Sequence, residues 1–413
     1  MTKLPIVNYL MNHASKHNVS FHMPGHKGSF IYKKYGYDYF LQNIMDCDLT
    51  ELPGADNLLQ PTGIITQTQD DFAKLYGVQR SYLLINGSSG GVIASIMGSV
   101  PKGKKLVIAR NCHKSAFNAL IMAGIEPVYA YPDIISKYGI AGDMPVHEIE
   151  RCLDENPTAD AVILPSPNYY GICSDIQAIA NVVHSHDKIL IVDQAHGAHL
   201  KFFSDMNCIP TMPKSAEEQG ADIVINSIHK TMSSFTQSAL LNLNSDRVDH
   251  YNLEDKLQMI QSTSPSYPLM ASLEITADIL KNHVHEIIKS WSDSLMYFYK
   301  ESMKIPGLKV MGNPYNDSTS INLDITKINL DMSDRGIDAI QLEKLLIKHG
   351  IFAELATGNI LMCMTGMGNT KDDIDKLLEA LRIISDKNGN KASNLTRKSR
   401  INNIFTNKLK LYP

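Results

Sequence analysis

The chain has 413 residues, of which 44% are hydrophobic and 20% charged, and its formal net charge is -4. This length predicts two or three domains with a sizeable core, and the charge balance gives no sign of a nucleic-acid-binding or membrane-binding surface. No apolar run approaches the roughly 20 residues of a transmembrane helix, and neither a signal peptide nor a CxxC pair is found, so we expect a cytoplasmic protein with free thiols.

In chain order, we expect an N-terminal segment over residues 1–55 and a large domain over residues 56–300. Within that domain, the apolar run 82–85 is followed by NGSSGG at 86–91, which opens a helical stretch. Glycines let backbone amides approach an anion, serines add hydroxyl donors, and a helix start offers free N–H groups and a positive dipole end. The segment predicts a phosphate-binding turn, with an ordinary capped turn as the alternative.

Five further apolar runs, rich in Val and Ile, follow in the middle of the chain. They lie at 105–110, 127–131, 161–165, 188–193 and 221–226. Their continuous apolar character suits strands that are covered on both faces, and the intervals between them leave room for crossover helices. The pattern predicts an α/β fold with a mostly parallel sheet.

Three polar residues stand at the ends of these runs and point to one chemistry. Asp193 could pair with a protonated ring nitrogen, or cap a helix. Lys230 can form an imine with an aldehyde cofactor if its pKa is lowered, and His113 could stack on a flat ring or be an ordinary hydrogen-bonded histidine. Together with a phosphate-binding turn, the carboxylate and the lysine are the parts that a pyridoxal 5'-phosphate (PLP) site needs.

After residue 300 the pattern changes to that of a small α+β domain, which we expect over residues 301–385. Predicted strands lie at 319–325, 351–356 and 359–365, and predicted helices at 337–349 and 371–384. Residues 386–413 are basic and rich in Asn, Ser and Lys, and we expect either a loosely held tail or an arm on the surface. The histidine pairs have no zinc-binding spacing, so no metal site is predicted.

Eight motifs in this sequence occur together in one known family. They are FHMPGHKGS (21–29), DLTELPGADNLLQPTG (48–63), INGSSGG (85–91), ARNCHKSAFNAL (109–120), PNYYGI (167–172), VDQAHGAH (192–199), SIHKT (227–231) and STSPSYPL (262–269). In this order they resemble the fold-type-I PLP-dependent decarboxylases of ornithine, lysine and arginine, in their short form. The resemblance implies an aspartate aminotransferase-like large domain with a small C-terminal domain.

The resemblance also implies a set of site residues. Lys230 would carry PLP as a Schiff base, Asp193 would pair with the pyridine nitrogen, and His113 would stack on the ring with His196 beside it. The phosphate would be surrounded by Ser88, Ser89, Gly90, Ser227 and His229. Thr263 and Ser264 would reach the phosphate region of the neighbouring subunit, because these enzymes form their sites at a homodimer interface.

The implied reaction is the decarboxylation of a basic amino acid to an amine and CO2, as in polyamine biosynthesis. His26, in the FHMPGHKG segment, is expected near the substrate, and Glu354 is a candidate partner for its basic group. The sequence has neither the receiver-like N-terminal wing of the large family members nor a Pro-Pro-Gly stretch after residue 384, which implies a reduced C-terminal region. Two alternatives stay open: another fold-type-I enzyme, such as an aminotransferase or lyase, and an inactive PLP-binding relative.

Overall fold

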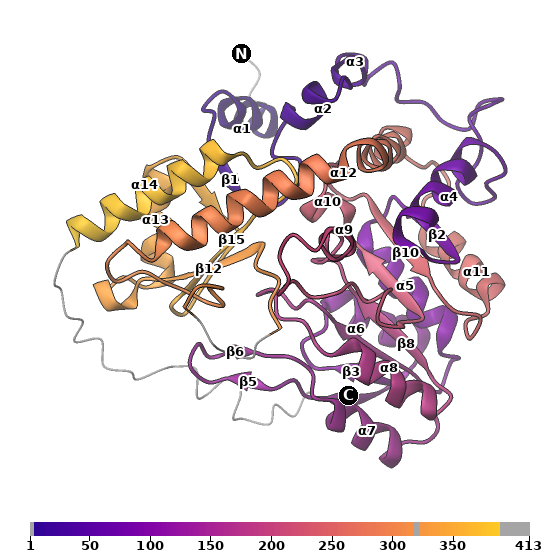
Figure 1. The fold of residues 1–413 in the computed structure, drawn as a ribbon. Helices are drawn as coiled ribbons and strands as arrows, with labels where there is room; N and C mark the ends of the chain where they lie inside the picture. The colour runs from indigo at the N-terminus through magenta and orange to yellow at the C-terminus, as the bar shows by residue number, and fades with distance from the viewer. Residues whose placement is uncertain (1–3, 317–321, 389–413) are drawn as a thin grey trace.

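The computed structural model describes residues 4–316 and 322–388, and its larger part is built on a seven-stranded sheet (Figure 1). All neighbouring strands are parallel except at β10, which is antiparallel to both of its neighbours. In spatial order the strands are β2 (Arg80–Leu84), β10 (Ala239–Leu243), β9 (Ile223–Asn226), β8 (Ile189–Asp193), β7 (Ala159–Pro165), β3 (Lys105–Ala109) and β4 (Glu126–Ala130). The five predicted parallel strands and the apolar run at 82–85 are therefore confirmed, whereas β10 was not predicted.

Helices cover both faces of this sheet, which explains why its strands are apolar without alternation. On one face, Ile108, Ile191 and Ile225 pack with residues of α5, α6 and α11. On the other, Val107, Val162 and Val192 pack with residues of α7 and α8. The helices of the larger part are α4 (Ile64–Tyr76), α5 (Gly87–Ser99), α6 (Lys114–Ala123), α7 (Val146–Glu155), α8 (Ile176–Ser185), α9 (Leu200–Met206), α10 (Ile228–Thr231) and α11 (His250–Ile260).

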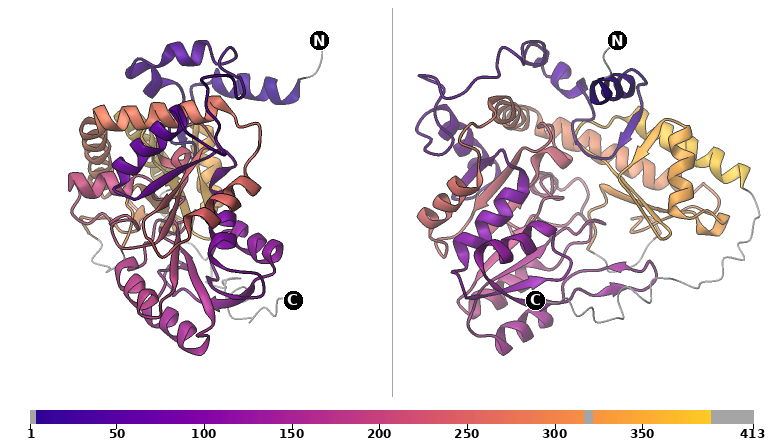
Figure 2. Two further views of the ribbon diagram at one scale, coloured as in Figure 1. Left: turned by 90° about the vertical axis from the view of Figure 1, so that its right-hand side faces the viewer. Right: turned by 180° about the vertical axis from the view of Figure 1, so that it is seen from behind.

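A smaller part lies beside the large sheet, as the reverse view in Figure 2 shows. Its antiparallel sheet has the order β11 (Lys309–Val310), β12 (Lys327–Asp331), β15 (Ile360–Met364) and β14 (Leu355–Thr357). The 3-10 turn η1 (Ser333–Arg335) and the helices α13 (Ala339–Lys348) and α14 (Lys371–Lys387) accompany it. Both helices begin with a capping box, from Asp338 and Thr370, which satisfies N–H groups that a helix start leaves free.

The long helix α12 (Tyr267–Ser302) connects the two parts, since it contacts α4 and α9 of the larger part and α14 of the smaller. The N-terminal region contains α1 (Pro5–Ala14), β1 (Val19–Phe21), α2 (Phe30–Lys34) and α3 (Asp38–Gln42). β1 pairs in parallel with β13 (Ile351–Ala353), so the beginning of the chain is joined to the smaller part. β5 (Ile134–Ile135) and β6 (Ile140–Ala141) form a separate hairpin. In the part of the chain that is described, no helix combines the length and apolarity needed to cross a membrane.

Two of the predictions for the smaller part need correction. The strand expected at 319–325 falls partly outside the described residues, and from 322 to 325 only Leu323 forms an isolated bridge, with Ile172. The chain turns here, because Asp324 accepts from the Thr326 N–H and its carbonyl from the Lys327 N–H, and the strand begins at Lys327. The expected strand 351–356 is interrupted at Glu354, which separates β13 from β14.

The other predicted elements of the smaller part are confirmed as α13, β15 and α14. α14 continues to Lys387, so the first residues of the expected tail are helical, and residues 389–413 lie outside the described part. The domain boundaries themselves stay a prediction.

Candidate active site

The predicted site residues follow strands whose carboxyl ends meet at one edge of the large sheet. Asp193 ends β8, and Lys230 lies in the short helix α10 directly after β9. These two strands are adjacent and parallel, with Asp193 opposite Ile225. Ligand-binding groups in open α/β sheets commonly lie at this edge. The structure therefore places the carboxylate and the lysine on the same side of the sheet.

The start of α5 forms the predicted phosphate-binding turn. The helix begins at Gly87, whose φ of +73° lies in the left-handed region that glycine adopts without strain, and Ser88, Ser89 and Gly90 occupy its first turn. The Ser227 hydroxyl donates to Ser88 Oγ at 2.7 Å, which joins the end of β9 to this turn. Hydroxyls and free N–H groups at a helix start suit a phosphate.

His229 is anchored beside this turn. Its Nδ1 lies 2.8 Å from the carbonyl oxygen of Ser238, so the ring donates there. Burial lowers the pKa of His229 to about 4, which keeps the imidazole neutral at neutral pH. The Ser227–Ser88 hydrogen bond joins the end of β9 to the start of α5, and His229 follows two residues after Ser227. The role of these residues toward a phosphate stays a prediction.

Asp193 is a buried carboxylate that suits a pyridinium partner. Its side chain is 7% exposed, and Oδ1 accepts from the Ala195 N–H at 3.1 Å. Burial raises the pKa of Asp193, while the charges of Lys230 and His113 and the Ala195 hydrogen bond oppose that shift. Among the described residues, no ion pair within 4 Å involves this carboxylate. A protonated ring nitrogen would supply the missing partner.

Lys230 lies against His196, which is a direct contact between two predicted site residues. Nζ of Lys230 is 3.0 Å from Nε2 of His196. Burial lowers the pKa of Lys230, although Asp193 and Glu354 oppose the shift. A lowered pKa favours the neutral amine, which is the form that imine formation requires. Nδ1 of His196 is buried and has no hydrogen-bond partner within residues 4–316 and 322–388, so this ring has capacity for a further contact.

His113 is the N-cap of α6 and is an exposed residue. Its Nδ1 accepts from the Ser115 N–H at 3.3 Å and lies 2.8 Å from Ser115 Oγ. Burial of the rest of the ring lowers the pKa of His113, and Lys230 and Lys114 lower it further while Asp193 opposes them. The influence of Asp193 and Lys230 places His113 within electrostatic reach of the site.

Glu354 lies in the site, at the interruption between β13 and β14. Its carboxylate accepts from the Tyr169 hydroxyl at 2.7 Å and from the Met23 N–H at 2.9 Å. Its negative charge opposes the lowering of the Lys230 pKa by burial. Tyr169 also lies over His196, with ring centroids 4.7 Å apart. Sequence reasoning did not single out Tyr169, yet it follows a parallel strand in the PNYYGI motif, which is the signal that identified the other residues.

The FHMPGHKG segment packs against the helix that carries Lys230. The Gly25 N–H donates to the His229 carbonyl at 2.7 Å, and a Cβ on Gly25 would lie 2.4 Å from the Met232 carbonyl oxygen. Met23 reaches Glu354, as described above. His26 has its Nδ1 at the Gly28 backbone and its ring against Phe235, and its role toward the substrate stays a prediction.

Thr263 and Ser264 lie between α11 and α12 and are exposed. The Ser264 N–H donates to Ser262 Oγ at 3.2 Å, within the same segment. Among the described residues, no hydrogen bond joins either residue to the phosphate-binding turn of its own chain. A role toward a neighbouring subunit stays a prediction.

Comparisons with known proteins agree with this geometry. The family model described as "Orn/Lys/Arg decarboxylase, major domain" matches residues 4–305. An arginine decarboxylase of Bacillus subtilis is 30% identical over 385 residues, which cover 93% of this chain and 77% of that protein.

Solved structures show the same fold. Lysine decarboxylase A from Pseudomonas aeruginosa has a TM-score of 0.73 at 21% identity, and the match covers 92% of this chain. The chain spans 60% of the length of that structure. A serine palmitoyltransferase variant from S. paucimobilis with a bound PLP–myriocin adduct has a TM-score of 0.64 at 12% identity, covering 90% of this chain and 87% of that one. The chain therefore has the fold of PLP fold-type-I enzymes, with a mostly parallel central sheet.

Proposed function

The chain belongs to the Orn/Lys/Arg decarboxylase family, and from this we propose that it is a PLP-dependent decarboxylase of a basic amino acid. The substrate would be lysine, ornithine or arginine, and the products the corresponding amine and CO2. The observation that supports this most strongly is the meeting of Lys230, Asp193 and the phosphate-binding turn at one edge of the sheet. When bound, PLP supplies a ring that takes up the electron pair left at Cα when CO2 departs.

The residues of this chain would hold the cofactor at three points. Ser88, Ser227 and the N–H groups at the start of α5 would bind its phosphate. Asp193 would hold a proton on the ring nitrogen, because a buried carboxylate that forms no ion pair among the described residues favours a cation beside it. The exposed ring of His113 would cover one face of the cofactor.

Lys230 would handle the proton close to the reacting carbon, and His196 would hold its amine in place. Since His196 Nε2 lies 3.0 Å from Lys230 Nζ, the imidazole can accept a hydrogen bond from the lysine. Burial lowers the pKa of His196 well below its ordinary value, so the ring stays neutral and takes this bond without being protonated. His229 donates through Nδ1 to the Ser238 carbonyl and keeps Nε2 as a second candidate for proton transfer.

Glu354 would bind the basic end of the substrate. Its two described partners, the Tyr169 hydroxyl and the Met23 N–H, are neutral donors that orient the carboxylate without neutralising it. An ammonium or guanidinium group is the natural counter-ion for such a carboxylate. The charge of Glu354 therefore supports a basic rather than an acidic amino acid.

We further propose that the enzyme is a homodimer in a reducing, cytoplasmic compartment. α1 buries none of its residues and exposes apolar side chains such as Ile6, Tyr9 and Met11, as expected of a surface that a second copy covers. All six cysteines are free, which suits a reducing environment. Ile6→Asp combined with Met11→Asp should weaken the dimer in sedimentation experiments, whereas dimers of unchanged stability would contradict the assignment of this surface.

The activity is tested by incubating the PLP-loaded protein with each basic amino acid labelled with ¹³C in its carboxyl group. We expect labelled CO2 and the matching amine by mass spectrometry, and neither product with Lys230→Ala. An aminotransferase would instead give a keto acid and the pyridoxamine form of the cofactor. An inactive relative would bind PLP without any product, and either result would refute the proposal.

A further inference from the structure

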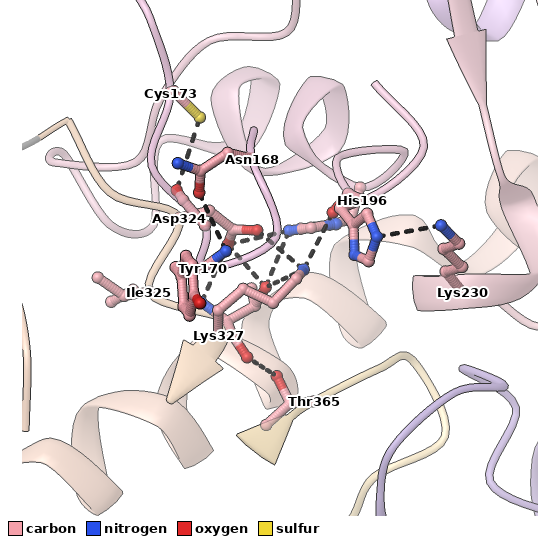
Figure 3. A network of polar contacts seen from close by, with 12 residues as sticks. Asn168, Tyr170, Cys173, His196, Lys230, Asp324, Ile325, Lys327 and Thr365 are labelled. Atoms are coloured by element: carbon pink, nitrogen blue, oxygen red, sulfur yellow. Dashed lines mark hydrogen bonds and ion pairs between the residues drawn. The ribbon is translucent and has the colours of Figure 1, made fainter. Parts of the chain in front are cut away.

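A cluster of buried polar and charged side chains lies between the candidate active site and the start of β12 in the small sheet (Figure 3). Asp324 and Lys327 form an ion pair of 3.1 Å, and both side chains are fully buried. His199 and Thr326 are fully buried beside them. None of these residues has a role in the function proposed above.

The ion pair has a partner for each of its polar groups. The Lys327 ammonium donates to Asp324 Oδ2 at 3.1 Å, to the His196 carbonyl at 3.0 Å and to Thr326 Oγ1 at 3.5 Å. Oδ1 of Asp324 accepts from the N–H and hydroxyl of Thr326 and lies 3.1 Å from His199 Nε2. Burial would raise the pKa of Asp324, but His199 and Lys327 more than offset this and lower it. Asp324 is therefore ionised at neutral pH.

The stability of the fold gives little reason for such a pair. Desolvation of two charges offsets much of their attraction, and an apolar pair of similar volume is often at least as stable. Lys327 is fully buried at the start of β12, where an apolar side chain could pack instead. The location of its ammonium suggests a different reason.

Lys327 and Lys230 contact the same residue at two different groups. Lys327 donates to the backbone carbonyl of His196, and Lys230 Nζ lies 3.0 Å from Nε2 of the His196 ring. The turn is also closely packed, because a Cβ on Gly197 would lie only 2.6 Å from Pro167 Cδ. With its carbonyl fixed and its turn confined, the backbone that carries the His196 ring is held in place beside Lys230.

We propose that Lys327 is a positioning residue, which holds His196 against Lys230 through the hydrogen bond to the His196 carbonyl. The inference rests on the proposed function, in which Lys230 carries the cofactor. Because Lys327 begins β12, the small sheet helps to set the geometry of a site on the large sheet. Burial and the charges of Lys230 and Lys327 all lower the pKa of His196, which keeps Nε2 available as an acceptor.

The test removes the ion pair as a unit. Lys327→Met alone would leave a buried carboxylate without its cation, which is strongly destabilising, so Asp324→Asn accompanies it. The matched control is Leu381→Ala, which creates a cavity in α14 and lowers stability without touching the turn. The full-length proteins are compared by hydrogen–deuterium exchange of peptides covering residues 194–199 without ligand, and by the rate at which added PLP develops the visible absorbance of its covalent adduct.

We expect amide exchange in this turn to be faster in the double variant than in the control. We also expect the double variant to capture PLP about tenfold more slowly than the unmodified protein, which is the equivalent of one charge-assisted hydrogen bond. Borohydride reduction and peptide mapping identify Lys230 as the modified residue. Turn exchange equal to that of the control, or a capture rate equal to that of the unmodified protein, would overturn the role of Lys327. Failure of the unmodified protein to capture PLP at Lys230 would instead refute the proposed function.

Discussion

Replacement of Asp193 by Asn tests the proposed pyridinium partner with little change in shape. The side chain is 7% exposed, and Oδ1 accepts from the Ala195 N–H at 3.1 Å, an interaction that the Asn side-chain oxygen can keep. The substitution therefore isolates the effect of the negative charge. That effect has opposite signs in the ligand-free and the PLP-bound protein.

In the ligand-free protein, we expect no loss of stability. Burial raises the pKa of Asp193 above its unfolded value, even though Lys230 opposes the shift. Such a carboxyl binds more protons when folded, so its contribution to the free energy of unfolding falls as the pH rises through that range. The Asn variant avoids this loss, and its melting temperature at neutral pH should equal or exceed that of the unmodified protein.

In the PLP-bound protein, the same substitution breaks a buried charge pair. Removal of one partner from such a pair typically costs about 3–5 kcal/mol, which corresponds to a factor of about 10² to 10⁴. We expect this loss to be divided between PLP affinity, measured by equilibrium dialysis, and turnover, measured as CO2 release. An Asn variant with near-normal affinity and turnover would refute the pyridinium role, and a large loss of stability without ligand would refute the electrostatic reasoning.

Three further predictions concern other residues of the site. Lys230→Ala should abolish both the visible absorbance of covalently bound PLP and turnover; a variant that kept either would contradict the Schiff-base assignment. Glu354→Gln should raise KM for the basic amino acid by about tenfold to a hundredfold through loss of a charge-assisted contact, whereas the exposed control Glu379→Gln should not; equal KM values would remove Glu354 from the substrate site. Burial lowers the pKa of Lys27 from 10.5 to about 7, although Glu354 opposes this shift. Between these two pH values the unfolded chain binds more protons at Lys27 than the folded protein does. The free energy of unfolding should therefore rise with pH by up to about 1.4 kcal/mol per pH unit more than in Lys27→Met. Urea denaturation of both proteins at two pH values measures that difference. An equal change in the free energy of unfolding between the two pH values in both proteins would contradict it.

Much of the site could be predicted because its signals are local in the sequence. A continuous apolar run identifies a buried parallel strand. A polar residue at the end of that strand must lie at the carboxyl edge of the sheet. Asp193, Lys230 and the NGSSGG turn were found in this way, and the structure brings them together. The two helices of the smaller part, α13 and α14, could also be predicted, since both have clear amphipathic periods and caps.

The sequence by itself therefore determined the parallel strands of the large sheet, their order along the chain and the identity of the residues at their ends. Only the tertiary structure decided which distant segments meet there. Glu354 and Tyr169 are separated by 185 residues, and Lys327 reaches His196 across 131. Neither pairing has a local signal, because a hydrogen bond between distant segments depends on how the two sheets pack and not on the period of either segment. The same packing divides the apolar run 351–356 between two sheets.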